Sequence, residues 1–157
     1  GDGGRHLITF HPHGGRHSST WFHHEPWLDF NMIQSGHSAT GVNYYNIRLD
    51  YNRRPPKPCM DGEPAYEYPP NDMPEKRPVG ETQVRSRAYW AMFGGALGHT
   101  YGTHPIWQMY APPRQPLWDV NTAWYDAMEL PGASFAPVAA KLGLVEDQDE
   151  LVARLLP

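Results

Sequence analysis

The sequence has a single cysteine, Cys59, among its 157 residues. One cysteine excludes an intrachain disulfide framework and a zinc site built from several cysteines. Lys and Arg (13) are outnumbered by Asp and Glu (17), so the formal charge is −4 and the clustered cationic excess of a nucleic-acid-binding protein is absent. No apolar run approaches the roughly 20 residues that cross a bilayer. We therefore expect no nucleic acid and no membrane among its partners.

Aliphatic side chains are also scarce. Leu, Ile, Val and Phe make up 27 of the 157 residues, or about 17%, a share that alone is typical of disorder. Disordered chains are poor in aromatic residues as well, whereas these reach 13% here, with six Trp and nine Tyr. The length suits one domain. The composition therefore predicts one folded domain that packs around rings rather than aliphatic side chains.

Motifs of several enzyme classes are missing. There is no Gly-x-Ser-x-Gly turn for a nucleophilic serine, and Cys59 lies inside an apolar segment rather than at an exposed turn. Serine and cysteine hydrolases are thus poorly supported. Phosphate-binding and dinucleotide-binding glycine motifs do not occur either. The chain has no initiator Met and no signal peptide, and we expect a processed product or a fragment of something longer.

Strand and helix signals alternate along the chain. Four apolar runs, each followed by a turn rich in Gly, His or Pro, predict strands at His6–Phe10, Asp29–Gln34, Pro58–Asp61 and Ala96–Tyr101. Apolar residues at helical spacing predict helices at Tyr44–Tyr51, Val84–Met92, Phe135–Leu142 and Leu151–Leu156. This alternation indicates an α/β fold of parallel βα units, in which the loops after the strands form the ligand-binding end.

The segment from Asp61 to Glu67 carries the clearest chemical signal. Asp61 and Glu63 flank a glycine at the end of a buried strand, where a carboxylate is costly unless it is solvated or used. Glycosidases need two carboxylates, one to protonate the leaving oxygen and one to attack the sugar or activate water. Glu63 suits the second role. A turn without function explains the segment equally well on composition alone.

Histidines gather near the predicted strand ends. His11 and His13 follow the first strand, His37 follows the second, and His99 lies on the fourth with His104 just beyond. Neutral imidazoles that bind sugar hydroxyls in a polar cleft are one interpretation, and structural histidines are another. A third is a metal hydrolase, because two His in an H-x-H pair with an acidic ligand can hold zinc. No H-E-x-x-H motif supports it, and we expect no metal and no cofactor.

Aromatic residues occur in or near the same loops. Their faces pack against the apolar faces of sugar rings and fix orientation, although each ring could equally be part of the core. These residues are Trp21, Trp27, Tyr66, Tyr101 and Trp107.

Four blocks resemble, in the same order, successive blocks of the apiosidase-like glycoside hydrolase family. They are His6–Arg16, Trp27–Gly36, Lys57–Glu67 and Ala88–Gly102, and the resemblance extends from Arg5 to Leu142. It implies a TIM-type (β/α)8 barrel in which this chain supplies strands five to eight. It also implies that Glu63, which closes strand seven, is the nucleophile of a retaining mechanism. The family's acid/base, an Asp in a Gly-Gly-Asp segment closing strand four, would lie before Gly1.

The resemblance thus implies a half-barrel over residues 1–143. The helical spacing of the last apolar residues adds a terminal amphipathic helix, over residues 144–157, that packs on it. Our leading hypothesis is a glycoside hydrolase that cleaves a plant or microbial polysaccharide once the barrel is complete. The alternative is a catalytically inactive structural or carbohydrate-binding protein. We expect carbohydrate and either an N-terminal half-barrel or a second copy as partners, and a secreted, periplasmic or cell-surface bacterial location. Beside Glu63, the expected substrate-binding residues are His11, His13, His37, Asp61, Tyr66, Glu67, His99, Tyr101 and Trp107.

Overall fold

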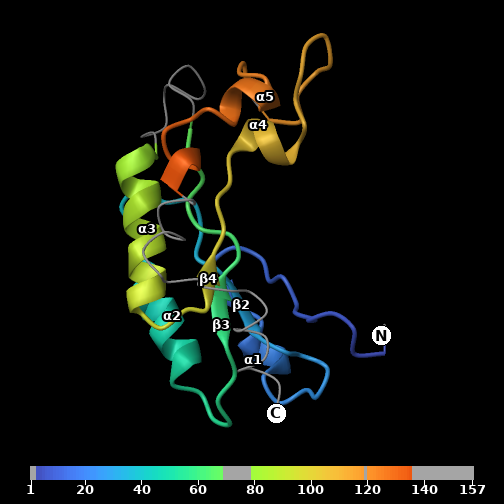
Figure 1. The fold of residues 1–157 in the computed structure, drawn as a ribbon, viewed down its shortest axis with the longest axis vertical. Helices are drawn as coiled ribbons and strands as arrows, with labels where there is room; N and C mark the ends of the chain where they lie inside the picture. The colour runs from blue at the N-terminus through green and yellow to red at the C-terminus, as the bar shows by residue number, and fades with distance from the viewer. Residues whose placement is uncertain (1–2, 69–78, 119, 136–157) are drawn as a thin grey trace.

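The computed structural model describes residues 3–68, 79–118 and 120–135 (Figure 1). Its strands are β1 (Arg16–His17), β2 (Asn31–Gln34), β3 (Cys59–Asp61) and β4 (Gly98–His99). Its helices are α1 (Ser19–Phe22), α2 (Tyr44–Tyr51), α3 (Glu81–Phe93), α4 (His104–Trp107), α5 (Trp124–Ala127) and the 3-10 helix η1 (Ala133–Phe135).

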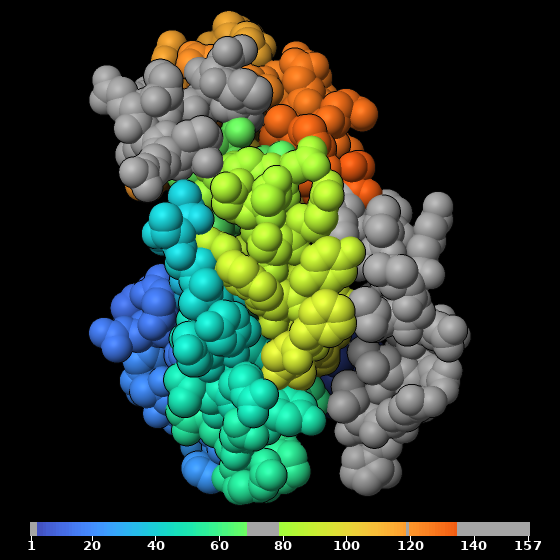
Figure 2. Space-filling model, turned by 90° about the vertical axis from the view of Figure 1, so that its left-hand side faces the viewer, coloured from blue at the N-terminus to red at the C-terminus, as the bar shows by residue number. Residues whose placement is uncertain are grey.

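The four strands form one sheet in the order β1-β2-β3-β4. β2, β3 and β4 run parallel, with Met32 opposite Met60 and Met60 opposite Gly98. Helices α2 and α3 lie side by side against the sheet (Figures 1 and 2). The expected α/β fold of parallel βα units is confirmed for this part of the chain. Three predicted strands and the helices at 44–51 and 84–92 are confirmed too, with the strands shorter than expected.

The predicted strand at His6–Phe10 is wrong. These residues carry no strand, although the Asp29 N–H donates to the Ile8 carbonyl over 2.9 Å. The reason is the Asp29 side chain, whose carboxylate accepts the Ile8 N–H at 2.6 Å and so takes a donor that a strand ladder would need. β1 pairs with β2 instead, and it runs antiparallel, with Arg16 opposite Gln34.

The core is aliphatic, which corrects the expectation of a core built from rings. One buried cluster joins Ile33, Ile47, Cys59 and Ala91 between the sheet and helices α2 and α3. No Trp, Tyr or Phe side chain placed by the structure is fully buried, and several Trp and Tyr are more than half exposed. The rings lie at the surface and around the site, so the number of aromatic residues in the sequence does not predict the size of the core.

A buried polar cluster ties β1, α1 and α2 together. The fully buried Asp50 carboxylate accepts hydrogen bonds from Ser19 Oγ at 2.5 Å and Arg53 Nε at 3.1 Å, and His17 Nδ1 lies 3.2 Å away. Burial alone would raise the pKa of Asp50, but the contacts with His17 and Ser19 outweigh it and hold that pKa below its ordinary value. Asp50 is therefore a buried charge that depends on its partners.

The last two predicted helices fall near the C-terminal end of the sequence. Residues 136–142 of the predicted helix at 135–142, the whole predicted helix at 151–156 and the proposed terminal unit 144–157 lie outside the described residues. Of the helices that the structure does describe, none is both long and apolar enough to span a bilayer. The short helices α4 and α5, which contact each other beyond the carboxyl end of β4 (Figure 1), were not predicted.

Candidate active site

Glu63 stands two residues after β3, at the carboxyl ends of the parallel strands. The strand before it is buried at Cys59 and Asp61, so the chain reaches the surface only as it leaves the sheet. Gly62 permits the backbone to pass close to the Met32 side chain, because a Cβ at that position would lie 2.5 Å from the Sδ atom of Met32. The Glu63 side chain is 20% exposed, which leaves its carboxylate open to a ligand.

Two imidazoles contact the Glu63 carboxylate. His37 Nε2 lies 2.9 Å from Oε1, and His11 Nε2 lies 3.2 Å from Oε2. The other nitrogen of His11, Nδ1, is 2.8 Å from the Pro12 carbonyl oxygen. Carbonyl and carboxylate oxygens only accept, so both nitrogens of His11 face acceptors. His11 and His37 thus each direct a ring nitrogen to the Glu63 carboxylate.

Tyr66 stands beside the same carboxylate. Burial raises the pKa of Tyr66 to about 12, and the negative charge of Glu63 and a hydrogen bond to it act in the same direction. The phenol is therefore protonated at neutral pH and donates to Glu63. The edge of the Tyr66 ring also packs against His37, with ring centroids 4.3 Å apart. Three side chains thus fix the orientation of one carboxylate.

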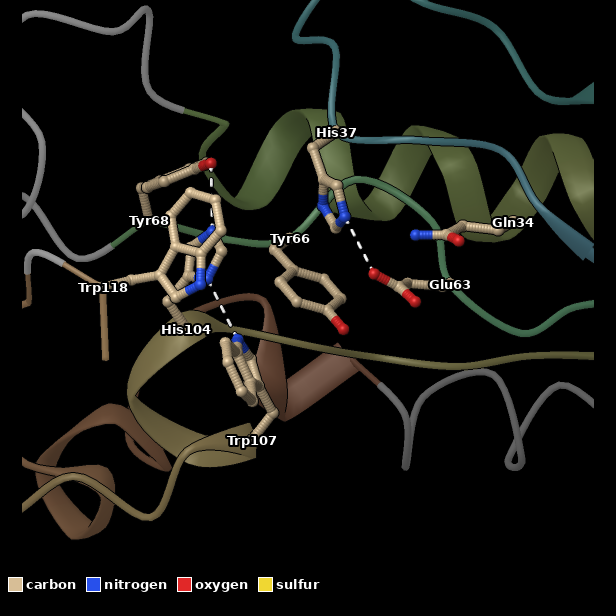
Figure 3. A pocket seen from close by; sticks show the side chains of 8 residues that line it. All are labelled: Gln34, His37, Glu63, Tyr66, Tyr68, His104, Trp107 and Trp118. Atoms are coloured by element: carbon tan, nitrogen blue, oxygen red, sulfur yellow. Dashed lines mark hydrogen bonds and ion pairs between the residues drawn. The ribbon is translucent and has the colours of Figure 1, made fainter. Parts of the chain in front are cut away.

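A pocket of about 600 Å³ opens over Glu63 (Figure 3). Its lining combines one carboxylate with an amide, two imidazoles and four aromatic rings. The lining residues are Gln34, His37, Glu63, Tyr66, Tyr68, His104, Trp107 and Trp118. Such a volume and mixture of apolar walls with a few polar groups are typical of small-molecule sites.

Asp61 and Glu67 lie next to this pocket without lining it. Asp61 is fully buried and accepts hydrogen bonds from Ser35 Oγ at 2.7 Å and from Asn43 Nδ2 at 2.8 Å. Burial raises the pKa of Asp61 although these donors oppose the change. Because Ser35 directly follows β2, Asp61 joins the ends of β2 and β3 and so supports the loop that carries His37.

Glu67 holds a second pair of segments. Its buried carboxylate accepts from Tyr101 Oη at 2.7 Å and from the Gly132 N–H at 3.0 Å. A Cβ at residue 132 would overlap this carboxylate, so the close approach requires the glycine. Glu67 and Tyr101 therefore connect the loop after β3 to the segment that follows α5.

The remaining expected site residues are spread more widely. Trp107 lines the pocket, whereas His13 is exposed in the turn before β1. His99 is on β4, and neither of its ring nitrogens has a hydrogen-bond partner within the described ranges. Burial lowers the pKa of His99 to about 4, so its imidazole is neutral. The structure thus brings His11, His37 and Tyr66 to Glu63.

Four lining residues were not among the expected site residues: Gln34, Tyr68, His104 and Trp118. Gln34 ends a predicted strand and His104 follows another, so strand-end position was a usable signal for both. Tyr68 lies two residues after Tyr66. No local pattern marks Trp118, which reaches the pocket only because the chain between α4 and α5 folds back.

We predict that chelators leave stability and activity unchanged. In the part of the chain that the structure describes, no three His, Cys, Asp or Glu side chains are arranged to hold a metal ion. His11 and His37 instead direct their Nε2 atoms to Glu63. The measurement is thermal unfolding and sugar release before and after dialysis against EDTA. Stoichiometric zinc in fresh protein, with activity restored only on adding zinc back, would contradict the prediction.

Comparison with known proteins places this geometry in a family. Residues 2–145 match the family model described as "Apiosidase-like, catalytic domain". A solved structure titled "Glycoside hydrolase" is 36% identical with a TM-score of 0.78 over 87% of this chain. A glycoside hydrolase family 5 structure from Bacteroides vulgatus is 34% identical with the same TM-score and coverage. Comparison with curated proteins gave no match.

The matches differ from this chain in extent. The chain covers 35% of the length of the first solved structure and 33% of the second, which is about a third of each. The residues that the family model matches, 2–145, include the described lining of the pocket and also His11, which contacts Glu63. The chain therefore belongs to the apiosidase-like glycoside hydrolase family.

Proposed function

We propose that this chain supplies the nucleophile of a retaining glycoside hydrolase that acts on a plant or microbial polysaccharide. The observation that carries the proposal is Glu63, an accessible carboxylate oriented by His11, His37 and Tyr66 at one end of an aromatic pocket. A nucleophile must be accessible and held in one orientation. Glu63 meets both requirements.

The mechanism is a double displacement. A Glu63 oxygen attacks the anomeric carbon while the bond from that carbon to the leaving oxygen breaks, and an acid elsewhere protonates the leaving oxygen. The resulting glycosyl ester on Glu63 is then attacked by water, which loses its proton to the same acid/base group. His37 and Tyr66 hold the carboxylate at the start and stabilise its charge when the ester breaks.

The acid/base group belongs, in this proposal, to the part of a complete barrel that precedes this chain. We assign β2, β3 and β4, with the segment before them, to strands five to eight of a (β/α)8 barrel. A barrel of this type takes about 250 residues. Retaining enzymes place their two carboxyl groups about 5–5.5 Å apart, so the partner must approach Glu63 from the open side of the pocket.

A second function is favoured by one observation. Among the described residues that line the pocket, Glu63 is the only carboxylate. A chain that meets no acid/base partner would bind carbohydrate without cleaving it. The two functions differ in one readout, the release of sugar from a bound glycan.

The test uses the complete barrel, meaning this chain joined to, or co-expressed with, a segment that supplies the first four strands. The 36%-identical glycoside hydrolase, of which this chain covers 35%, is the first source in which to seek such a segment. The protein is incubated with a panel of plant and bacterial polysaccharides, and NMR follows the anomeric configuration of the first product. Release of a sugar with its configuration retained supports the proposal. Binding without release favours the second function.

We further predict that the chain alone does not persist as a compact monomer. Among the described strands, β1 and β4 form the two edges of the sheet. A sheet edge is a template for pairing with a strand of another chain. We propose pairing with an N-terminal half-barrel or with a second copy. A stable monomer in analytical ultracentrifugation, with slow hydrogen exchange at both edges, would contradict this.

A further inference from the structure

The pocket has two chemically different ends. Glu63, His37 and Gln34 form a polar end at the carboxyl termini of β2 and β3, and Tyr66 stands between this end and the other (Figure 3). The far end consists of rings from the loop after Tyr66 and from the segment after β4. A pocket of about 600 Å³ lies well inside the 300–1,000 Å³ range that accommodates ligands larger than one sugar ring.

His104 organises the aromatic end. Its Nδ1 accepts a hydrogen bond from Trp107 Nε1 at 3.0 Å, so the proton of the neutral ring is on Nε2, which faces Tyr68 Oη at 3.3 Å. The ring is thus held at both nitrogens. Trp118 stacks on it with ring centroids 5.7 Å apart and an interplanar angle of 19°.

Gln108 presets the position of Trp118. Gln108 is buried, and its Oε1 accepts the backbone N–H of Leu117 at 2.8 Å and that of Trp118 at 3.4 Å. The Arg114 guanidinium donates to the carbonyls of Gln108 and Met109, and these hydrogen bonds restrain the same loop. The loop therefore presents Trp118 without help from a ligand.

Trp118 nevertheless remains open to solvent. Its side chain is 52% exposed and that of Trp107 is 45% exposed, although both border the pocket. An ordered, half-exposed indole beside a polar site offers an apolar face to a ligand, and the apolar faces of sugar rings pack well on such a surface.

We propose that the substrate is an oligosaccharide and that two of its linked rings bind in this pocket. The reacting ring contacts Glu63, and a neighbouring ring packs on Trp118 beside His104. The proposal rests on the proposed function and adds to it a substrate class and a specificity-determining residue. An isolated monosaccharide with a small leaving group would use only the polar end.

The test compares two substrates in the complete barrel. One is the shortest oligosaccharide from which the enzyme releases its sugar, and the other is the glycosyl fluoride of that sugar, which has one ring and no second. We expect Trp118→Ala to lower kcat/KM for the oligosaccharide about tenfold and to leave that for the fluoride within about twofold. Trp118→Phe, which keeps an aromatic face, should restore most of the loss.

Leu117→Ala is the matched control, because Leu117 is 79% exposed on the same loop and does not line the pocket. It should change neither substrate. If Trp118→Ala lowers kcat/KM equally for both substrates, or for neither, the second-ring site is refuted while the glycosidase function stands. If the wild-type protein cleaves no glycan and no fluoride, the proposed function fails and this inference fails with it.

Discussion

Glu63→Gln is expected to lower turnover in the complete barrel by several powers of ten. The glutamine amide cannot attack an anomeric carbon, whereas it has nearly the shape of the carboxylate and still accepts hydrogen bonds from His37 and Tyr66. The free energy of unfolding should therefore change little. Initial rates on the polysaccharide identified from the panel, together with urea unfolding, give both quantities. Glu25→Gln, at an exposed position, is the matched control.

Chemical rescue separates the nucleophile from other roles. Glu63→Ala removes the carboxylate and leaves space for azide, which can attack the anomeric carbon from the same side. The expected product is a glycosyl azide of inverted configuration, formed only by this variant. A Glu63→Gln enzyme that keeps more than about a tenth of wild-type turnover would remove Glu63 from the role of nucleophile.

Asp50→Ala is expected to have the largest effect on stability, a loss of about 3–5 kcal/mol in the free energy of unfolding. The substitution leaves Ser19, His17 and Arg53 without their shared carboxylate in a buried position. Urea unfolding at neutral pH measures the loss, in whichever assembled form the protein adopts. Asp126→Ala, on the exposed side of α5, should cost far less.

The same carboxylate makes a pH-dependent contribution with a definite sign. The pKa of Asp50 is lowered in the folded protein, so the stabilisation is present above the pKa of an unfolded aspartate, about 3.9, and is lost as the pH falls through the folded value. Acidification should therefore cost the wild-type protein more stability than it costs Asp50→Ala. The measurement is acid unfolding of the two proteins. If both lose stability by the same amount as the pH falls, Asp50 carries no such charge.

The parts of the fold that local pattern determines could be predicted. Residues 58–61 form an apolar run closed by a glycine, and Tyr44–Tyr51 has regular helical spacing, so both elements appear where expected. The strand at His6–Phe10 failed because the Asp29 carboxylate, 21 residues away from Ile8, competes for its N–H. No pattern within the run itself reveals that competitor.

The candidate site divides in the same way. Glu63 and His37 follow predicted strands, and the carboxyl ends of parallel strands meet at one edge of a sheet, so their proximity was predictable. The role expected of Glu63 came from family resemblance. Trp118 could not be predicted, since its place depends on Gln108 and on a stacking contact with His104. Composition also misled: the rings counted toward a core lie at the surface or around the pocket.

The most direct test of the central claim is mass spectrometry of the trapped intermediate. The complete barrel is treated with the 2-deoxy-2-fluoro glycosyl fluoride of the released sugar, which slows hydrolysis of a glycosyl ester, and is then digested with pepsin. The account predicts a peptide containing Asp61–Glu67 that is heavier by one fluorosugar, with the modification on Glu63. An adduct on another residue, or an enzyme that inverts configuration and forms no adduct, would contradict it.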